Sequence, residues 1–209
     1  MQHSARLFIP LLFALTAASL RGNIITSAND PALVAAHLID FNAVPTGGFW
    51  GAIALDGTAF KGDNALNISP WGSDYGLDAD VLTNQAGFLL PSQQMTITMP
   101  IAVPAFGMLL YCPDGCSMNV RDGSDQFIEL INIAPTSFRQ TVFYGSKQTD
   151  ATIKAVSLSW GQSVNGFPGT VMVDNFQYAA GASSVPEPTY AGLLFSLLSS
   201  ALLFRRRTR

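Results

Sequence analysis

The sequence is poor in the residues that most enzymes use for catalysis. Only 12% of its 209 residues are charged, and it has two histidines, two cysteines and two glutamates. Between residues 20 and 184, His37 is the sole histidine and Glu129 the sole glutamate. A Ser–His–Asp triad would therefore depend on His37, and a glycosidase pair would lack a second glutamate. No glycine-rich phosphate loop lies between a strand pattern and a helix pattern. We expect a non-enzymatic protein, and a cryptic glycoside hydrolase built on an aspartate pair is the weaker alternative.

Positive charge is also scarce before the C-terminus. Residues 20–184 contain six basic and thirteen acidic residues, a net charge of about −7. A surface this acidic repels phosphate backbones, so nucleic acid is not an expected partner.

The C-terminus carries three features in a fixed order. Val185-Pro186-Glu187-Pro188 precedes an uncharged apolar run from Tyr190 to Phe204, and three arginines follow at 205–207. A single span in lipid must be helical, and consecutive arginines stay on the cytoplasmic side. A buried amphipathic helix of the globular domain is the alternative. We predict a linker at 181–188, a transmembrane helix at 189–204 and a basic cytoplasmic tail at 205–209.

This arrangement resembles the PEP-CTERM sorting signal of Gram-negative bacteria. The resemblance implies processing by exosortase, a membrane protease-transpeptidase, after transient anchoring in the inner membrane. It also implies delivery to the cell envelope or to an extracellular exopolysaccharide matrix, as in a biofilm. The residues that match the signal are Pro186, Glu187, Pro188, Arg205, Arg206 and Arg207.

The N-terminus has the pattern of an export signal. Arg6 precedes an apolar stretch from Leu7 to Leu15, interrupted only by Pro10, and Ala17-Ala18-Ser19 supplies small residues for cleavage. We predict a signal peptide at 1–19 and an exported domain at 20–180.

Short alternating segments separated by turns fill the exported domain. Met95-Thr96-Ile97-Thr98-Met99 alternates strictly, and Ala105–Tyr111 is an apolar run suited to a buried strand. Further strands are expected at Phe138–Tyr144, Thr152–Trp160 and Thr170–Tyr178, and one short helix at Asn29–His37. The pattern predicts an all-β fold, an antiparallel β-sandwich of jelly-roll type.

The layout of these segments resembles the lectin-type or carbohydrate-binding jelly rolls often found ahead of this sorting signal. The segments that carry the resemblance are Ile39-Asp40-Phe41-Asn42, Phe106-Gly107, Asp122-Gly123 and Val173–Tyr178. It implies a fold more than an activity, with extracellular polysaccharide as a candidate partner.

Cys112 and Cys116 flank the turn sequence Pro113-Asp114-Gly115. In an exported protein a disulfide is the expected state of such a pair, closing a small loop between two strands. A redox or metal pair is the alternative, although the spacing is not Cys-x-x-Cys.

Calcium and sugars are the candidate ligands. Asp40 and Asp174 could share a calcium ion if the first and last strands are neighbours, and Asp74, Asp78 and Asp80 form a second acidic group. The alternative is that these carboxylates cap turns.

For sugar binding, the stretch from Trp71 to Tyr75 combines two aromatic side chains with Asp74 in a polar loop. Trp50 and Trp160 are further aromatic candidates. Packing within the sandwich is the alternative role for all of these rings.

Overall fold

The computed structural model describes residues 23–84, 93–150, 152–160 and 170–179. These residues form two antiparallel β-sheets and two short 3₁₀ turns, without an α-helix among them, which confirms the all-β prediction. No described helix is long and apolar enough to cross a membrane. The predicted signal peptide (1–19), linker (181–188), membrane helix (189–204) and basic tail (205–209) lie outside the described residues.

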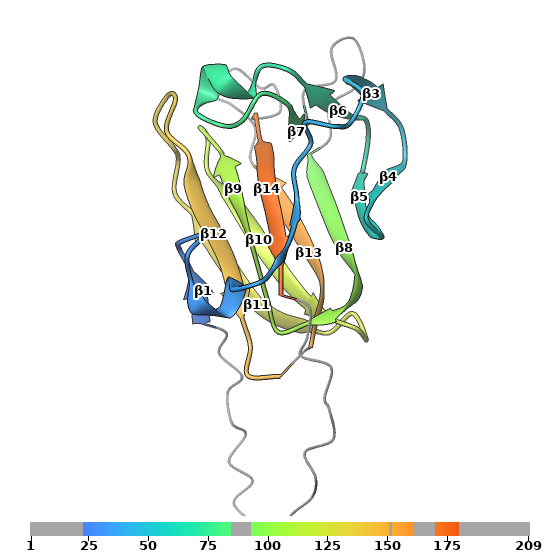
Figure 1. Ribbon diagram of the computed structural model, residues 1–209, viewed down its shortest axis with the longest axis vertical. Helices are drawn as coiled ribbons and strands as arrows, with labels where there is room; N and C mark the ends of the chain where they lie inside the picture. The colour runs from blue at the N-terminus through green and yellow to red at the C-terminus, as the bar shows by residue number, and fades with distance from the viewer. Residues whose placement is uncertain (1–22, 85–92, 151, 161–169, 180–209) are drawn as a thin grey trace, which may run out of the picture.

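The larger sheet contains both the first and the last described strands (Figure 1). Its hydrogen-bonded order is β1-β12-β9-β14-β7-β6-β3, and β2 pairs with β14 beside β7. The strands are β1 (Asn23–Ile25), β2 (His37–Ile39), β3 (Gly47–Phe49), β6 (Leu66–Ser69), β7 (Val81–Thr83), β9 (Ala105–Tyr111), β12 (Val142–Lys147) and β14 (Met172–Tyr178).

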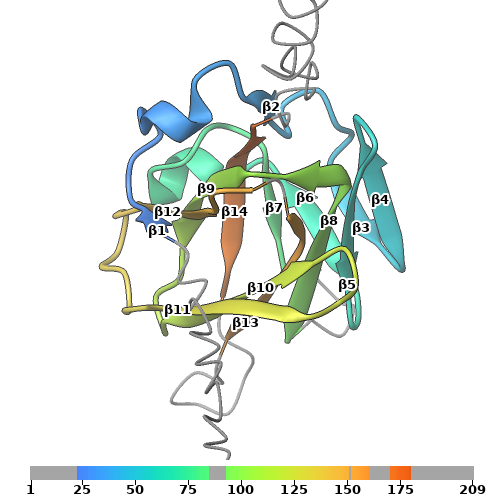
Figure 2. The ribbon, with the colours of Figure 1, turned by 90° about the horizontal axis from the view of Figure 1, so that it is seen from below.

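The second sheet packs against the first and has the order β11-β10-β13-β8-β5-β4. Figure 2 shows the two layers along the strands. The strands are β4 (Ala52–Leu55), β5 (Thr58–Gly62), β8 (Gln94–Val103), β10 (Cys116–Asp122), β11 (Phe127–Ile133) and β13 (Ile153–Trp160).

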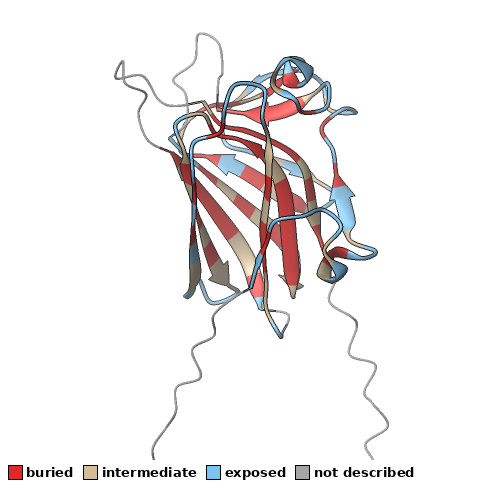
Figure 3. Cartoon of the chain, turned by 90° about the vertical axis from the view of Figure 1, so that its left-hand side faces the viewer, coloured by how far each residue is buried: buried red, intermediate tan, exposed pale blue. Residues whose placement is uncertain are grey.

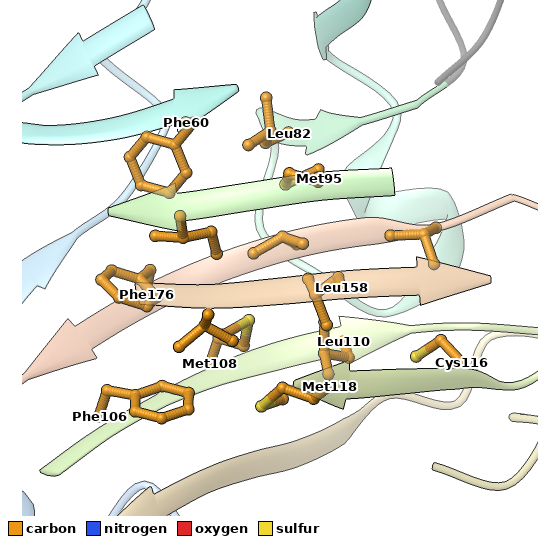
Figure 4. Close-up of a cluster of buried hydrophobic side chains, with 14 of the residues drawn as sticks. Phe60, Leu82, Met95, Phe106, Met108, Leu110, Cys116, Met118, Leu158 and Phe176 are labelled. Carbon is orange, nitrogen blue, oxygen red and sulfur yellow. The ribbon is translucent and has the colours of Figure 1, made fainter. Parts of the chain in front are cut away.

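The hydrophobic core lies between the sheets and follows from strand alternation. Met95, Ile97 and Met99 are buried, while Thr96 and Thr98 face outward. Figure 3 shows the buried residues on the inner faces. Four fully buried phenylalanines from both sheets meet in the centre, and several are labelled in Figure 4. They are Phe41, Phe60, Phe106 and Phe176, with the Phe60 and Phe176 rings edge-to-face at 5.8 Å.

Two predicted elements need correction. The helix expected at Asn29–His37 is only a 3₁₀ turn, η1 (Pro31–Leu33), because Val34 has an extended ψ of 128° and Ala35 a left-handed φ of 59° before the chain enters β2 at His37. The strand expected at Phe138–Tyr144 begins at Val142 instead. Phe138 therefore belongs to the connection between β11 and β12 rather than to a strand.

Both ends of the described chain lie at the same end of the sandwich. Asn23 pairs with Lys147, Lys147 with Ala105, and the N–H of Ala179 donates to the carbonyl of Ala105. Met172, at the start of β14, lies at the opposite end, together with the loop that contains η2 (Gly72–Tyr75) (Figure 1).

Candidate functional site

The connection from β6 to β7 covers the outer face of the larger sheet. Within it, η2 ends at Gly76, whose φ of 82° is left-handed and favours glycine. Gly72 is required by space, since a Cβ there would lie 2.0 Å from the carbonyl oxygen of Asp78. Tyr75 packs against Tyr111 at a ring distance of 5.0 Å. These contacts fix the position of η2 over the sheet.

Below this loop, three neighbouring strands bring polar side chains side by side. Asn67 pairs with Thr83, and Thr83 pairs with Met172, so the three residues form one row across β6, β7 and β14. They face outward because Leu82 and Val173 face the core. Ser69 and Thr170 lie two residues from Asn67 and Met172 respectively, on the same face.

The loop and the row of side chains enclose a pocket of about 370 Å³. Trp71, which is 64% exposed, and the half-buried Tyr75 line its upper side. The prediction that Trp71 and Tyr75 belong to one site is consistent with this pocket. Asp74 is exposed and does not line it. The remaining lining residues are Asn67, Ser69, Pro70, Thr83, Thr170 and Met172.

The described lining of the pocket combines aromatic rings with uncharged polar groups. Tyr75 is the one titratable side chain among the described residues that line it. Aromatic faces combined with hydroxyl and amide groups match a ligand that has apolar ring faces and many hydroxyls. The pocket size falls within the range of small-ligand sites.

A second polar feature surrounds Asp174 on β14. The first strand, β1, pairs with β12, and it is β2, just before Asp40, that pairs with β14, with Ile39 opposite Phe176. Asp174 is fully buried and accepts hydrogen bonds from the N–H groups of Asp78 at 2.9 Å and Asn175 at 2.7 Å. Burial raises the pKa of Asp174, and the nearby charges of Asp78 and Asp40 raise it further.

The acidic residues are held by local hydrogen bonds. Asp78 accepts from the side-chain amide of Asn175 at 3.0 Å, and Asn42 links Asp40 to the N–H of Asp80. Within the described ranges, no group of three or more carboxylate, imidazole or thiol side chains is arranged to hold a metal ion. Calcium at Asp40 and Asp174 therefore stays a prediction.

Cys112 and Cys116 lie side by side as buried thiols at the β9–β10 turn. The hydrogen bond with Cys116 and burial both raise the pKa of Cys112 far above its ordinary value. Gly115 closes the turn, with φ of 74° and its N–H donating to the carbonyl of Cys112 at 3.0 Å. The predicted turn is confirmed, and the predicted disulfide stays a prediction.

The other aromatic candidates lie outside the pocket. Trp160 is only 8% exposed and packs in the core, in agreement with the packing alternative. Trp50 is 57% exposed on the connection between β3 and β4.

The sole histidine and the sole glutamate of residues 20–184 both lie within the described residues. His37 is exposed and contacts Asp56 at 3.2 Å. Glu129 is half-buried on β11, and its carboxylate accepts a 2.7 Å hydrogen bond from the hydroxyl of Ser146. The sorting residues Pro186, Glu187, Pro188 and Arg205 to Arg207 lie outside the described residues.

Comparisons with known proteins give structural neighbours only. No protein-family model matches the sequence, and no curated protein matches it. A solved family 29 carbohydrate-binding module has a TM-score of 0.41 and 9% identity, covering 66% of this chain and 89% of that one. A family 43 arabinoxylan arabinofuranohydrolase from Bacillus subtilis in complex with cellotetraose has a TM-score of 0.35 and 13% identity, covering 48% of this chain and 21% of that one. Similarity at this level assigns no function to the chain.

Proposed function

We propose that this protein is an exported, non-enzymatic β-sandwich that binds carbohydrate in the pocket between Trp71 and the outer face of the larger sheet. The observation that carries the proposal is the pocket itself, whose lining combines the exposed indole of Trp71 with amide and hydroxyl side chains. A jelly-roll type of sandwich and extracellular polysaccharide as partner belong to the same proposal.

The exposure of Trp71 sets the expected size of the effect. Stacking of one sugar ring on the indole would remove roughly 80 Å² of apolar surface from water, which is worth about 2 kcal/mol. That free energy corresponds to a change in Kd of about 30-fold.

The test is a binding screen of the full-length protein on an array of bacterial and plant glycans, followed by titration calorimetry. Trp71→Ala should weaken binding by about 30-fold. Trp50→Ala is the matched control, because Trp50 is also exposed but lies outside the pocket. The proposal fails if no glycan binds, or if Trp71→Ala and Trp50→Ala both bind with the Kd of the unaltered protein.

Hydrolysis is tested on the same ligand. Any glycan that binds should show no increase in reducing ends after prolonged incubation with the protein. Release of sugar would support the alternative of a glycoside hydrolase, which needs two carboxylates about 5–10 Å apart.

The route to the envelope is a separate proposal. Pro186-Glu187-Pro188, the apolar run and the terminal arginines support sorting through a PEP-CTERM signal. A secreted reporter fused to residues 185–209 should lose this segment in an exosortase-positive host. A fusion with alanine at 186, 187 and 188 is the control and should stay unprocessed. If the unaltered fusion also stays intact, the sorting proposal is wrong.

A further inference from the structure

A third aromatic side chain stands next to the pocket. Phe138, in the connection between β11 and β12, is 68% exposed. Its ring meets the ring of Tyr75 edge-to-face, at 6.0 Å and 83°. Single exposed apolar residues are common on protein surfaces. Here, however, Trp71 and Tyr75 line one pocket and Tyr75 also contacts Phe138, and we call these three side chains the aromatic strip.

The segment that carries Phe138 is fixed against the site. Thr136 anchors it to the end of β9, because its N–H donates to the carbonyl of Cys112 at 2.9 Å and its hydroxyl accepts from the N–H of Cys112 at 3.0 Å. Close packing joins it to η2, since a Cβ on Gly76 would lie 2.8 Å from the carbonyl oxygen of Arg139. Phe138 is therefore held beside Tyr75 by contacts on both sides.

One side of the Phe138 ring already has a neighbour. The guanidinium carbon of Arg139 lies 5.2 Å from the ring centroid, a cation–π geometry. Arg139 adopts a left-handed φ of 61°, which is uncommon for a residue with a side chain. The large exposed fraction of Phe138 shows that most of its surface stays open to a ligand.

Tyr75 links the two parts of the aromatic strip. It lines the pocket together with Trp71 and contacts Phe138, which does not line the pocket. A ligand that filled only the pocket would leave Phe138 uncovered. A ligand that continued past Tyr75 would meet a second exposed aromatic side chain.

We propose that Phe138 forms an additional sugar subsite, so that the protein recognises an extended run of sugar rings within a polysaccharide rather than a single terminal sugar. This inference rests on the proposed carbohydrate-binding function. It adds a residue to the site and specifies the ligand class as a glycan chain that is longer than the pocket.

The experiment measures Kd for oligosaccharides of two to six units of the glycan that the array identifies, using the full-length protein. Phe138→Ala should weaken binding of the longest oligosaccharide by about 10-fold and leave the disaccharide unchanged. Phe138→Trp should restore the dependence of Kd on chain length. Phe127→Ala is the matched control, because Phe127 is 61% exposed on β11 and lies outside the aromatic strip.

The outcomes separate the two proposals. If Trp71→Ala weakens binding at every chain length while Phe138→Ala behaves as the unaltered protein at every length, the subsite is wrong and the proposed function stands. If neither substitution changes any Kd, or no glycan binds, both are wrong. An equal loss at all lengths for Phe138→Ala would also contradict an additional subsite, since the disaccharide would then need Phe138.

Discussion

Calcium is expected to raise the Tm of this protein by acting on the carboxylates around Asp174. In the structure Asp174 is fully buried, and its raised pKa reflects both burial and the charges of Asp78 and Asp40. Ionised Asp174 therefore destabilises the folded state. A divalent cation shared with the exposed Asp40 would replace this repulsion by attraction, and hard carboxylate oxygens are the ligands that calcium prefers.

The size of the effect follows from linkage. Calcium sites in extracellular modules have a Kd of about 10⁻⁴–10⁻³ M. With Kd at about 1 mM and about 10 mM free calcium, binding to the folded state alone adds about 1.4 kcal/mol to the free energy of unfolding. For a domain of this size, that corresponds to a rise in Tm of roughly 3–6 °C.

Differential scanning fluorimetry in calcium and in a chelator measures this shift. Asp40→Asn should abolish it while keeping the side-chain acceptor for the N–H of Asn42. Asp125→Asn is the control, because it removes the same charge from a side chain that is 81% exposed and pairs only with Arg121 at the surface. Identical Tm values with and without calcium, or an undiminished shift in Asp40→Asn, would refute the reasoning.

The raised pKa of Asp174 also sets the sign of a pH effect in the absence of calcium. The contribution of Asp174 to the free energy of unfolding is fully present below its unfolded-state pKa of about 3.8, and it is lost as the pH rises through its higher folded-state pKa. Between these two pKa values the free energy of unfolding falls by about 1.4 kcal/mol per pH unit. As the pH rises through this window, the urea midpoint of Asp174→Asn should therefore fall less than that of the unaltered protein. An equal fall would contradict the raised pKa of Asp174. Separately, if the protein is exported as proposed, it should carry a disulfide between Cys112 and Cys116, detected as a loss of two hydrogens by mass spectrometry. Reduction of the disulfide that closes this short loop should lower the free energy of unfolding by about 2 kcal/mol. Two free thiols after export would contradict the predicted disulfide.

Strands with strict alternation were predictable from the sequence, while their order was not. Met95, Ile97 and Met99 point into the core because side chains in a strand alternate between faces. The placement of β2 and β7 along one edge of β14 depends on pairings between residues far apart in the sequence, such as Phe176 with Ile39 and Met172 with Thr83. Local pattern carries no information about such pairings.

Some residues of the candidate site were also predictable from the sequence, and others were not. Trp71 and Tyr75 were predictable because two aromatic residues occur close together in a polar loop. Asn67 and Thr83 were missed because only the register of β6 and β7 places them side by side. Phe138 was missed because an aromatic residue shortly before a strand reads as part of that strand. Its position between Ser137 and Arg139, after Pro135-Thr136, was the available signal for a loop.

The direction in which the chain leaves the sandwich determines how the pocket is presented. The described chain begins and ends at one end of the larger sheet, and Met172 in the pocket lies six residues away from Tyr178 along β14. At about 3.3 Å per residue, this separation is roughly 20 Å. Attachment through the C-terminal segment would therefore hold the domain by the end remote from the pocket. The aromatic strip would then face away from the supporting surface, where it could engage long polymers that have no room to enter between the domain and a membrane.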